Sequence, residues 1–144
     1  MRKDVKVGII AGRGGPIGKY RWSVLIIDRA YDEVMKILNA EQYAYIAEQV
    51  KTLATEADPT RSQFCSVDAV EDFHELREKH GVLGKINLRV FFFIDRSRRA
   101  IVILGALKKE NNGPTPPGAR ITMRRRMRLF CDGIIDVPAL PSAG

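Results

Sequence analysis

The chain has 144 residues, of which 45% are hydrophobic and 28% are charged, and its formal net charge is +7. This length suits one domain, and the composition is apolar enough to bury a core, which excludes a disordered polyelectrolyte. The longest apolar runs, at 90–94 and 100–107, are far shorter than the roughly 20 residues that cross a bilayer, so no membrane-spanning helix is expected.

The positive charge lies in the second half of the chain. Residues 1–76 contain 10 Lys and Arg against 12 Asp and Glu, whereas residues 77–144 contain 14 against 5. Such asymmetry indicates a surface that binds a polyanion, most often nucleic acid, although a basic face can also serve solubility alone.

The cysteines and the N-terminus bear on the cellular compartment. Cys65 and Cys131 are far apart and match no metal-ligand spacing, and the basic N-terminus lacks the hydrophobic region of a secretory signal. We therefore expect reduced thiols, no metal site and a non-secreted, cytoplasmic protein.

Residues 1–21 contain five glycines and one proline without sustained periodicity, which predicts a flexible leader. A phosphate-binding loop would need glycine in place of Arg13 and serine or threonine in place of Tyr20. The G-x-x-x-G-x-G spacing that begins at Gly8 has no long strand before it and no helical run after it. A nucleotide site is therefore not expected in this segment.

A strand and two helices are expected next. Residues 22–28 (WSVLIID) form a short apolar run that predicts a buried strand. Apolar residues then recur three and four positions apart, as in amphipathic helices. Asn39, with Gln42 three positions later, matches a capping box between the two helices, and Asp58-Pro59 should end the second.

Three further strands and a final helix are expected in the second half. Residues 86–94 alternate as a strand does, and a turn at 95–99 joins them to a strand over 100–107. Residues 67–79 are ambiguous between helix and strand by periodicity, and residues 70–78 within them are assigned to a third antiparallel strand. Pro117 suits the first turn of a basic helix over 118–130, and residues 131–144 are expected to be a flexible tail.

These elements predict an α+β fold in a single domain over residues 22–130. An N-terminal strand and a helical hairpin should pack on an antiparallel sheet, with a C-terminal basic helix. Phe91 and Phe93 share a strand face in this arrangement, and they could stack on nucleobases. Because the two predicted helices must pack on a face of the sheet, we favour the interpretation of Phe91 and Phe93 as core residues.

Four cations lie at or near the predicted sheet: Arg77, Arg89, Lys108 and Lys109. Such residues are rarely inserted into a sheet without a partner or a ligand. If they converge on a concave face, they would bind an RNA backbone and stabilise the transition state of its cleavage. The alternative is a set of ordinary ion pairs with the glutamates at the same strand ends.

Metal-free RNA cleavage also needs a proton acceptor and a proton donor. A lysine with a lowered pKa, Lys108 or Lys109, could be the base. His74 could face the site, although a histidine at a strand edge is more often solvated. The run Arg124-Arg125-Arg126 on the last helix is usually a solvated face, but here it could be a phosphate track or a docking surface for an acidic partner.

Four segments resemble the RelE/HigB superfamily of toxins from bacterial toxin–antitoxin pairs, and most of all its phage-derived HigB-like branch. They are ELREKHG at 75–81, LRVFFFID at 88–95, VILGALKKE at 102–110 and TPPGA at 115–119. In order of elements, the resemblance covers residues 22–130. The chain departs from the branch at 91–93, where three phenylalanines stand in place of an expected tyrosine.

The resemblance implies a RelE-like fold and a metal-independent, ribosome-dependent mRNA endonuclease that inhibits translation and needs no cofactor. Its partners would be mRNA on the ribosome and a cognate antitoxin protein of the helix-turn-helix type. Because one fold hosts several activities, two alternatives remain, a non-catalytic gyrase poison and a nucleic-acid-binding module that has lost catalysis. The expected catalytic residues are Arg77, Arg89, Lys108 and Lys109. The residues expected to bind RNA are His74, Arg120, Arg124, Arg125 and Arg128.

Overall fold

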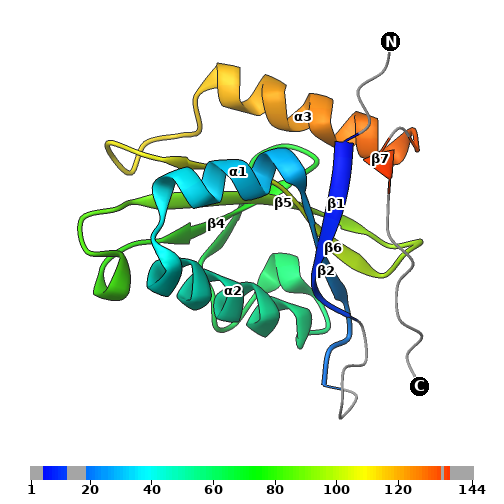
Figure 1. Ribbon diagram of the computed structural model, residues 1–144, viewed down its shortest axis with the longest axis horizontal. Helices are drawn as coiled ribbons and strands as arrows, with labels where there is room; N and C mark the ends of the chain where they lie inside the picture. Colours follow the sequence, from blue (N-terminus) through cyan, green and yellow to red (C-terminus); the bar gives the residue numbers. More distant parts are fainter. Residues whose placement is uncertain (1–4, 13–18, 134, 137–144) are drawn as a thin grey trace.

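The order of the elements follows the predicted succession, with additional strands near both ends. The computed structural model describes residues 5–12, 19–133 and 135–136 (Figure 1). Its elements are β1 (Val5–Ala11), β2 (Ser23–Ile27), α1 (Asp28–Ile37), α2 (Ala40–Ala54), β3 (Val67–Ala69), β4 (His74–Glu78), β5 (Leu88–Asp95), β6 (Ala100–Lys108), α3 (Pro117–Cys131) and β7 (Ile135–Asp136). Two short 3-10 helices cover Pro59–Arg61 and Gly81–Leu83. The predicted α+β class is confirmed.

The strands form one mixed sheet in the order β3-β4-β5-β6-β2-β1-β7. β4, β5 and β6 are antiparallel neighbours, as predicted for the meander. The N-terminal strand is predicted to pack on an antiparallel sheet, whereas β2 is part of the sheet and pairs in parallel with β6, which makes the sheet mixed. The helical hairpin between β2 and the meander is a crossover long enough to bring β2 alongside β6 in the same direction.

The predicted boundaries also need correction at both ends. Residues 5–11 of the expected flexible leader form β1, which pairs with β2. In the expected tail, residues 135–136 form β7, which pairs in parallel with β1. The remaining residues assigned to the leader and tail fall partly outside the described ranges. These strands are held by distant partners, which local composition does not reveal.

The ambiguous segment is a hairpin rather than one strand. β3 and β4 are antiparallel, and the turn between them is closed by a hydrogen bond from Val70 N to Phe73 O. The assignment of 70–78 to a strand therefore holds for 74–78 alone. Because the turn is short, the hydrophobic patterns of β3 and β4 are almost continuous in the sequence and resemble the pattern of a single strand.

The helical hairpin has the predicted local signals. Asn39 Oδ1 accepts a hydrogen bond from Gln42 N at 2.8 Å, and Gln42 Oε1 accepts one from Asn39 N at 3.0 Å. This reciprocal capping box starts α2 and fixes the turn after α1. All residues of β2 are buried, in agreement with the strand predicted there.

α2 and α3 lie on opposite sides of the sheet, and α1 lies along β6 beyond the end of β2 (Figure 1). There the Glu33 carboxylate accepts hydrogen bonds from Ala106 N at 3.1 Å and from Arg126 at 2.8 and 2.9 Å. Arg126 also donates to Leu104 O. This contact satisfies backbone groups at an open strand edge and joins α1 to α3. Within the described residues, no helix is both long and apolar enough to span a membrane.

Phe91, Phe92 and Phe93 belong to the core. Their exposed fractions are 0, 1 and 6%, and the Phe93 ring packs edge to face on Phe130 of α3. The favoured core interpretation is confirmed. A register shift between Phe91 and Phe92 leaves Leu104 of β6 without an opposite partner, so the strand pair contains a bulge.

Gly105 allows α3 to approach β6, and its replacement should destabilise the protein. A Cβ atom there would clash with Met123 Cε and lie 2.7 Å from Arg126 Nη1, and both side chains are buried. Gly105→Ala should therefore reduce the free energy of unfolding by about 1–3 kcal/mol in urea denaturation. Gly118→Ala is the control, because a Cβ there meets no atom within 4 Å, and helix propensity should leave the stability unchanged or raise it by up to about 1 kcal/mol. Equal midpoints for Gly105→Ala and the unmodified protein would contradict this packing.

Candidate functional site

Arg77 and Arg89 lie directly opposite each other on β4 and β5. Like charges in such a cross-strand pair repel unless an anion lies between them. Glu75 supplies it, because its Oε1 accepts from Arg89 Nη1 at 3.0 Å and from Arg77 Nε at 2.9 Å. Its Oε2 accepts from Thr115 Oγ1 at 2.6 Å. Arg89 also donates to Gly113 O at 3.1 Å, so the network joins two strands to the loop before α3.

The two arginines differ in access to solvent. Arg89 is 1% exposed, beneath the loop that enters α3, whereas the Arg77 side chain keeps about a third of its surface. Arg77 also forms an ion pair with Asp68 at 2.9 Å. The expected open, concave face of converging cations is thus covered in this structure. For Arg89 the geometry matches the ion-pair alternative and gives it a positioning role toward Glu75.

Arg89→Ala should lower the stability of the folded protein, whatever its effect on activity. Removing one partner of a buried ion pair typically costs about 3–5 kcal/mol, because the other charge stays buried. Arg125→Ala, an exposed position on α3, should change the free energy of unfolding by no more than about 0.5 kcal/mol. Urea denaturation of both variants measures the difference. An Arg89→Ala protein with unchanged stability would show that the pair does not hold these segments together.

The larger open space in this region is a cleft of about 730 Å³ beside β4. It lies where β3 has ended and the edge of β4 is uncovered, since the last backbone bond to that edge runs from Arg77 N to Ser66 O. α2, the 62–66 loop, the end of β4 and the loop after β6 contribute side chains. Those on which the site depends are Tyr45, Phe64, Arg77, Glu78, Lys79 and His80.

Groups that can transfer protons line the cleft. The Tyr45 hydroxyl donates to Glu78 Oε2 at 3.2 Å. Burial raises the pKa of Glu78, and the hydrogen bond from Tyr45 opposes that rise. Burial and the neighbouring Glu78 charge raise the pKa of Tyr45. His80, two residues after Glu78, has a positive φ of 69°, an uncommon conformation for a residue other than glycine.

Glu78→Gln should make the protein more stable at neutral pH. Because the folded-state pKa is raised, the Glu78 contribution favours folding when the carboxyl is protonated and is lost as the pH rises through the folded pKa. The glutamine amide oxygen would still accept from Tyr45 without burying a charge. Thermal unfolding should show a gain that grows from about pH 4 to about pH 7. The control Glu110→Gln, exposed after β6, should show no such growth, and a gain independent of pH would contradict the account.

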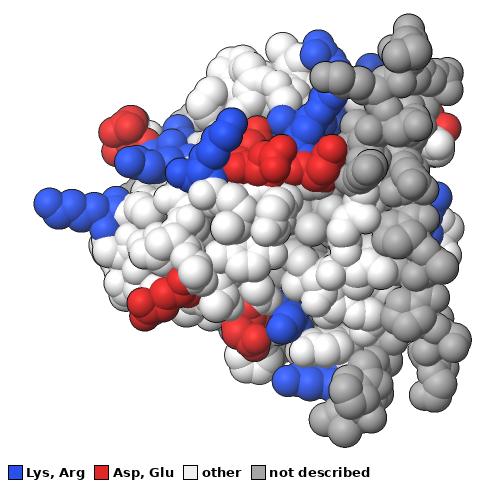
Figure 2. Space-filling model, viewed as in Figure 1, with Lys and Arg blue, Asp and Glu red and all other residues white. Residues whose placement is uncertain are grey.

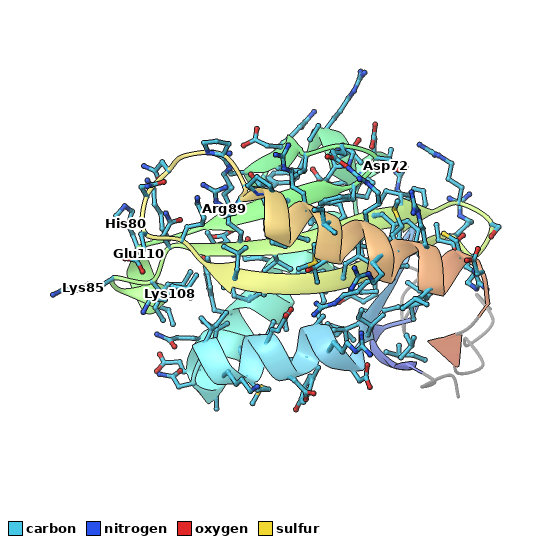
Figure 3. All side chains as sticks on the ribbon, turned by 90° about the horizontal axis from the view of Figure 1, so that it is seen from above. Asp72, His80, Lys85, Arg89, Lys108 and Glu110 are labelled. Atoms are coloured by element: carbon cyan, nitrogen blue, oxygen red, sulfur yellow. The ribbon has the colours of Figure 1, made fainter. Side chains whose placement is uncertain are left out.

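The other predicted site residues are dispersed. Lys108 is exposed, and Lys109 Nζ donates to Pro114 O at 3.0 Å. Figure 3 shows Lys108 at the same end of the molecule as His80 and Lys85, whereas Arg89 lies further inward. His74 stacks on Phe92 and projects from the opposite face of β4 to Arg77, and burial lowers its pKa. The structure therefore does not bring His74 together with the predicted cations.

The arginines of α3 also divide into groups. Arg120 and Arg124 contact the Glu71 carboxylate. Arg126, part of the run Arg124-Arg125-Arg126, is buried against Glu33, while Arg125 and Arg128 are exposed. On α3, a track for phosphates is therefore limited to the exposed side that carries Arg125 and Arg128.

The face formed by α1 and α2 is not a basic surface. Figure 2 shows positive and negative side chains intermixed in a band across its upper half, with uncharged surface in the middle. Ile9 on β1 and Tyr31 and Met35 on α1 are exposed apolar residues. In the part of the chain that the structure describes, no three His, Cys, Asp or Glu side chains gather to hold a metal ion.

Most residues of the cleft are not among the site residues predicted from the sequence. Glu78, Lys79 and His80 follow Arg77 directly, and this run of titratable groups at a strand end was the available signal. Phe64, an isolated aromatic residue in a polar loop, was a second one. Tyr45 had none, because its hydroxyl meets Glu78 only in the folded chain.

The sequence matches no protein-family model, and no curated protein sequence is significantly similar to it.

Proposed function

We propose that this protein is a toxin of the RelE/HigB type that cuts mRNA on the ribosome without a metal ion. The proposal is supported by the four sequence segments that resemble this superfamily and by a compatible α+β arrangement with a basic last helix. The observation that carries it is the cleft beside β4, which combines cations with groups able to move protons. A cognate antitoxin would be its protein partner.

The cleft contains what metal-free cleavage of RNA requires. The reaction needs a base for the ribose 2′-hydroxyl, an acid for the leaving 5′-oxygen and positive charge at the phosphate. Glu78, with its raised pKa, would accept the 2′ proton. The O2′–P bond forms as the P–O5′ bond breaks, and His80 would give a proton to the 5′-oxygen. Arg77 and Lys79 would stabilise the phosphorane charge.

The missing strand tyrosine does not weigh against this assignment. Phe91, Phe92 and Phe93 are all core residues, so a tyrosine hydroxyl at these positions would point into packed side chains. In this chain, any proton donor must come from elsewhere, and Glu78 and His80 lie at the end of the adjacent strand β4.

Expression of the protein alone should stop translation and leave new 5′ ends within reading frames, detected by primer extension on cellular mRNA. His80→Ala should lower the cleavage rate about 10²–10⁴-fold, since it removes the acid. Lys85→Ala, an exposed lysine outside the cleft lining, should cleave as the unmodified protein does.

Other outcomes would reject the proposal. Growth arrest with intact mRNA and halted DNA replication would favour the gyrase-poison alternative. RNA binding without growth arrest or cleavage would favour a binding module. Cleavage that His80→Ala leaves unchanged would remove the cleft from the mechanism.

A further inference from the structure

Phe64 is unusually exposed for a large apolar side chain that is held in place. Its exposed fraction is 74%, against 54% for Ile121, the next of the exposed large hydrophobic residues in the described ranges. The Ser62 hydroxyl accepts hydrogen bonds from Phe64 N at 3.2 Å and from Cys65 N at 2.9 Å. The Cys65 thiol contacts Gln49 of α2. The ring is thus presented to solvent by an ordered loop.

Two cations line the same cleft as this loop. Arg77 lies near the end of β4 and Lys79 directly follows that strand, and Lys79 Nζ is 3.4 Å from Asn112 Oδ1. Both line the same cleft as Phe64. Arg77 is held by Glu75 and Asp68, whereas Lys79 has no ion pair among the residues that the structure describes. Lys79 is therefore the more available of the two for an anion.

Hydrogen-bonding groups line the same cleft as the ring and the cations. The amide of Gln49 and the bonded pair of Tyr45 and Glu78 line the space there. Such groups can meet the polar edge of a base whose face rests on an aromatic ring. The volume of about 730 Å³ lies within the range of small-ligand pockets.

We propose that the cleft binds one nucleotide of single-stranded RNA, with the base against Phe64 and the phosphate at Lys79 and Arg77. An exposed aromatic face beside fixed cations is how proteins hold unpaired nucleotides. An acidic peptide would use the cations but would leave the ring without a function. The choice of RNA over DNA rests on the proposed function, whereas the nucleotide site itself does not.

The test is an NMR chemical-shift titration of the full chain with uridine 5′-monophosphate, uridine and inorganic phosphate. Phe64→Ala should weaken binding of both uridine and its monophosphate roughly 5- to 100-fold, because stacking is lost. Lys79→Ala should weaken the monophosphate and leave uridine unaffected. The controls are Ile121→Ala, an exposed apolar residue on α3, and Lys85→Ala, an exposed lysine, and both should bind as the unmodified protein does.

Several results would overturn the inference. If inorganic phosphate binds as tightly as uridine 5′-monophosphate, the cleft is a site for anions and not for a nucleotide. A Phe64→Ala protein that binds like Ile121→Ala would remove the stacking contact, and shifts confined to Arg125 and Arg128 would place the nucleotide elsewhere. Cellular cleavage without nucleotide binding in the cleft would reject this inference and keep the proposed function. Nucleotide binding in the cleft without cellular cleavage would keep this inference and reject the proposed function.

Discussion

The buried carboxylate of Glu75 is the group on which the arrangement of β4, β5 and the entry to α3 depends. It is 2% exposed and accepts from Arg77, Arg89 and Thr115. Burying such a charge without partners would cost several kcal/mol, so the three segments are stable only together. Through Arg89 and Gly113 the same network holds the loop before α3 against the sheet.

Arg77 and Arg89 lie on the same face of the sheet, but the Glu75 network gives them different roles. Arg89 lies on an inner strand beneath that loop, and its charge is used inside the protein. Arg77 lies opposite it on β4, beside the short outer strand β3, which ends near it. Its side chain therefore reaches a cleft that β3 leaves uncovered. Arg89 fixes Glu75, and Glu75 in turn fixes the position of Arg77 at the cleft.

The sequence predicts the elements whose signals are local. β2, β5, β6, both helices of the hairpin and the capping box at Asn39 follow from patterns within a few residues. β1 and β7 do not, because their pairing joins opposite ends of the chain. The bond between Glu33 and Arg126 spans 93 positions, so an arginine in a basic run could not be recognised as buried. The same holds for the cleft, whose groups come from α2, a loop and β4.

The proposed RNA site is the open edge of β4 and not Arg89. A crystal structure with a dinucleotide that lacks the attacking 2′-hydroxyl tests it most directly. We expect a base on Phe64 and a phosphate beside Lys79, with Arg89 still bonded to Glu75 and Gly113. A phosphate bound to Arg89, with the loop before α3 displaced from the sheet, would contradict it.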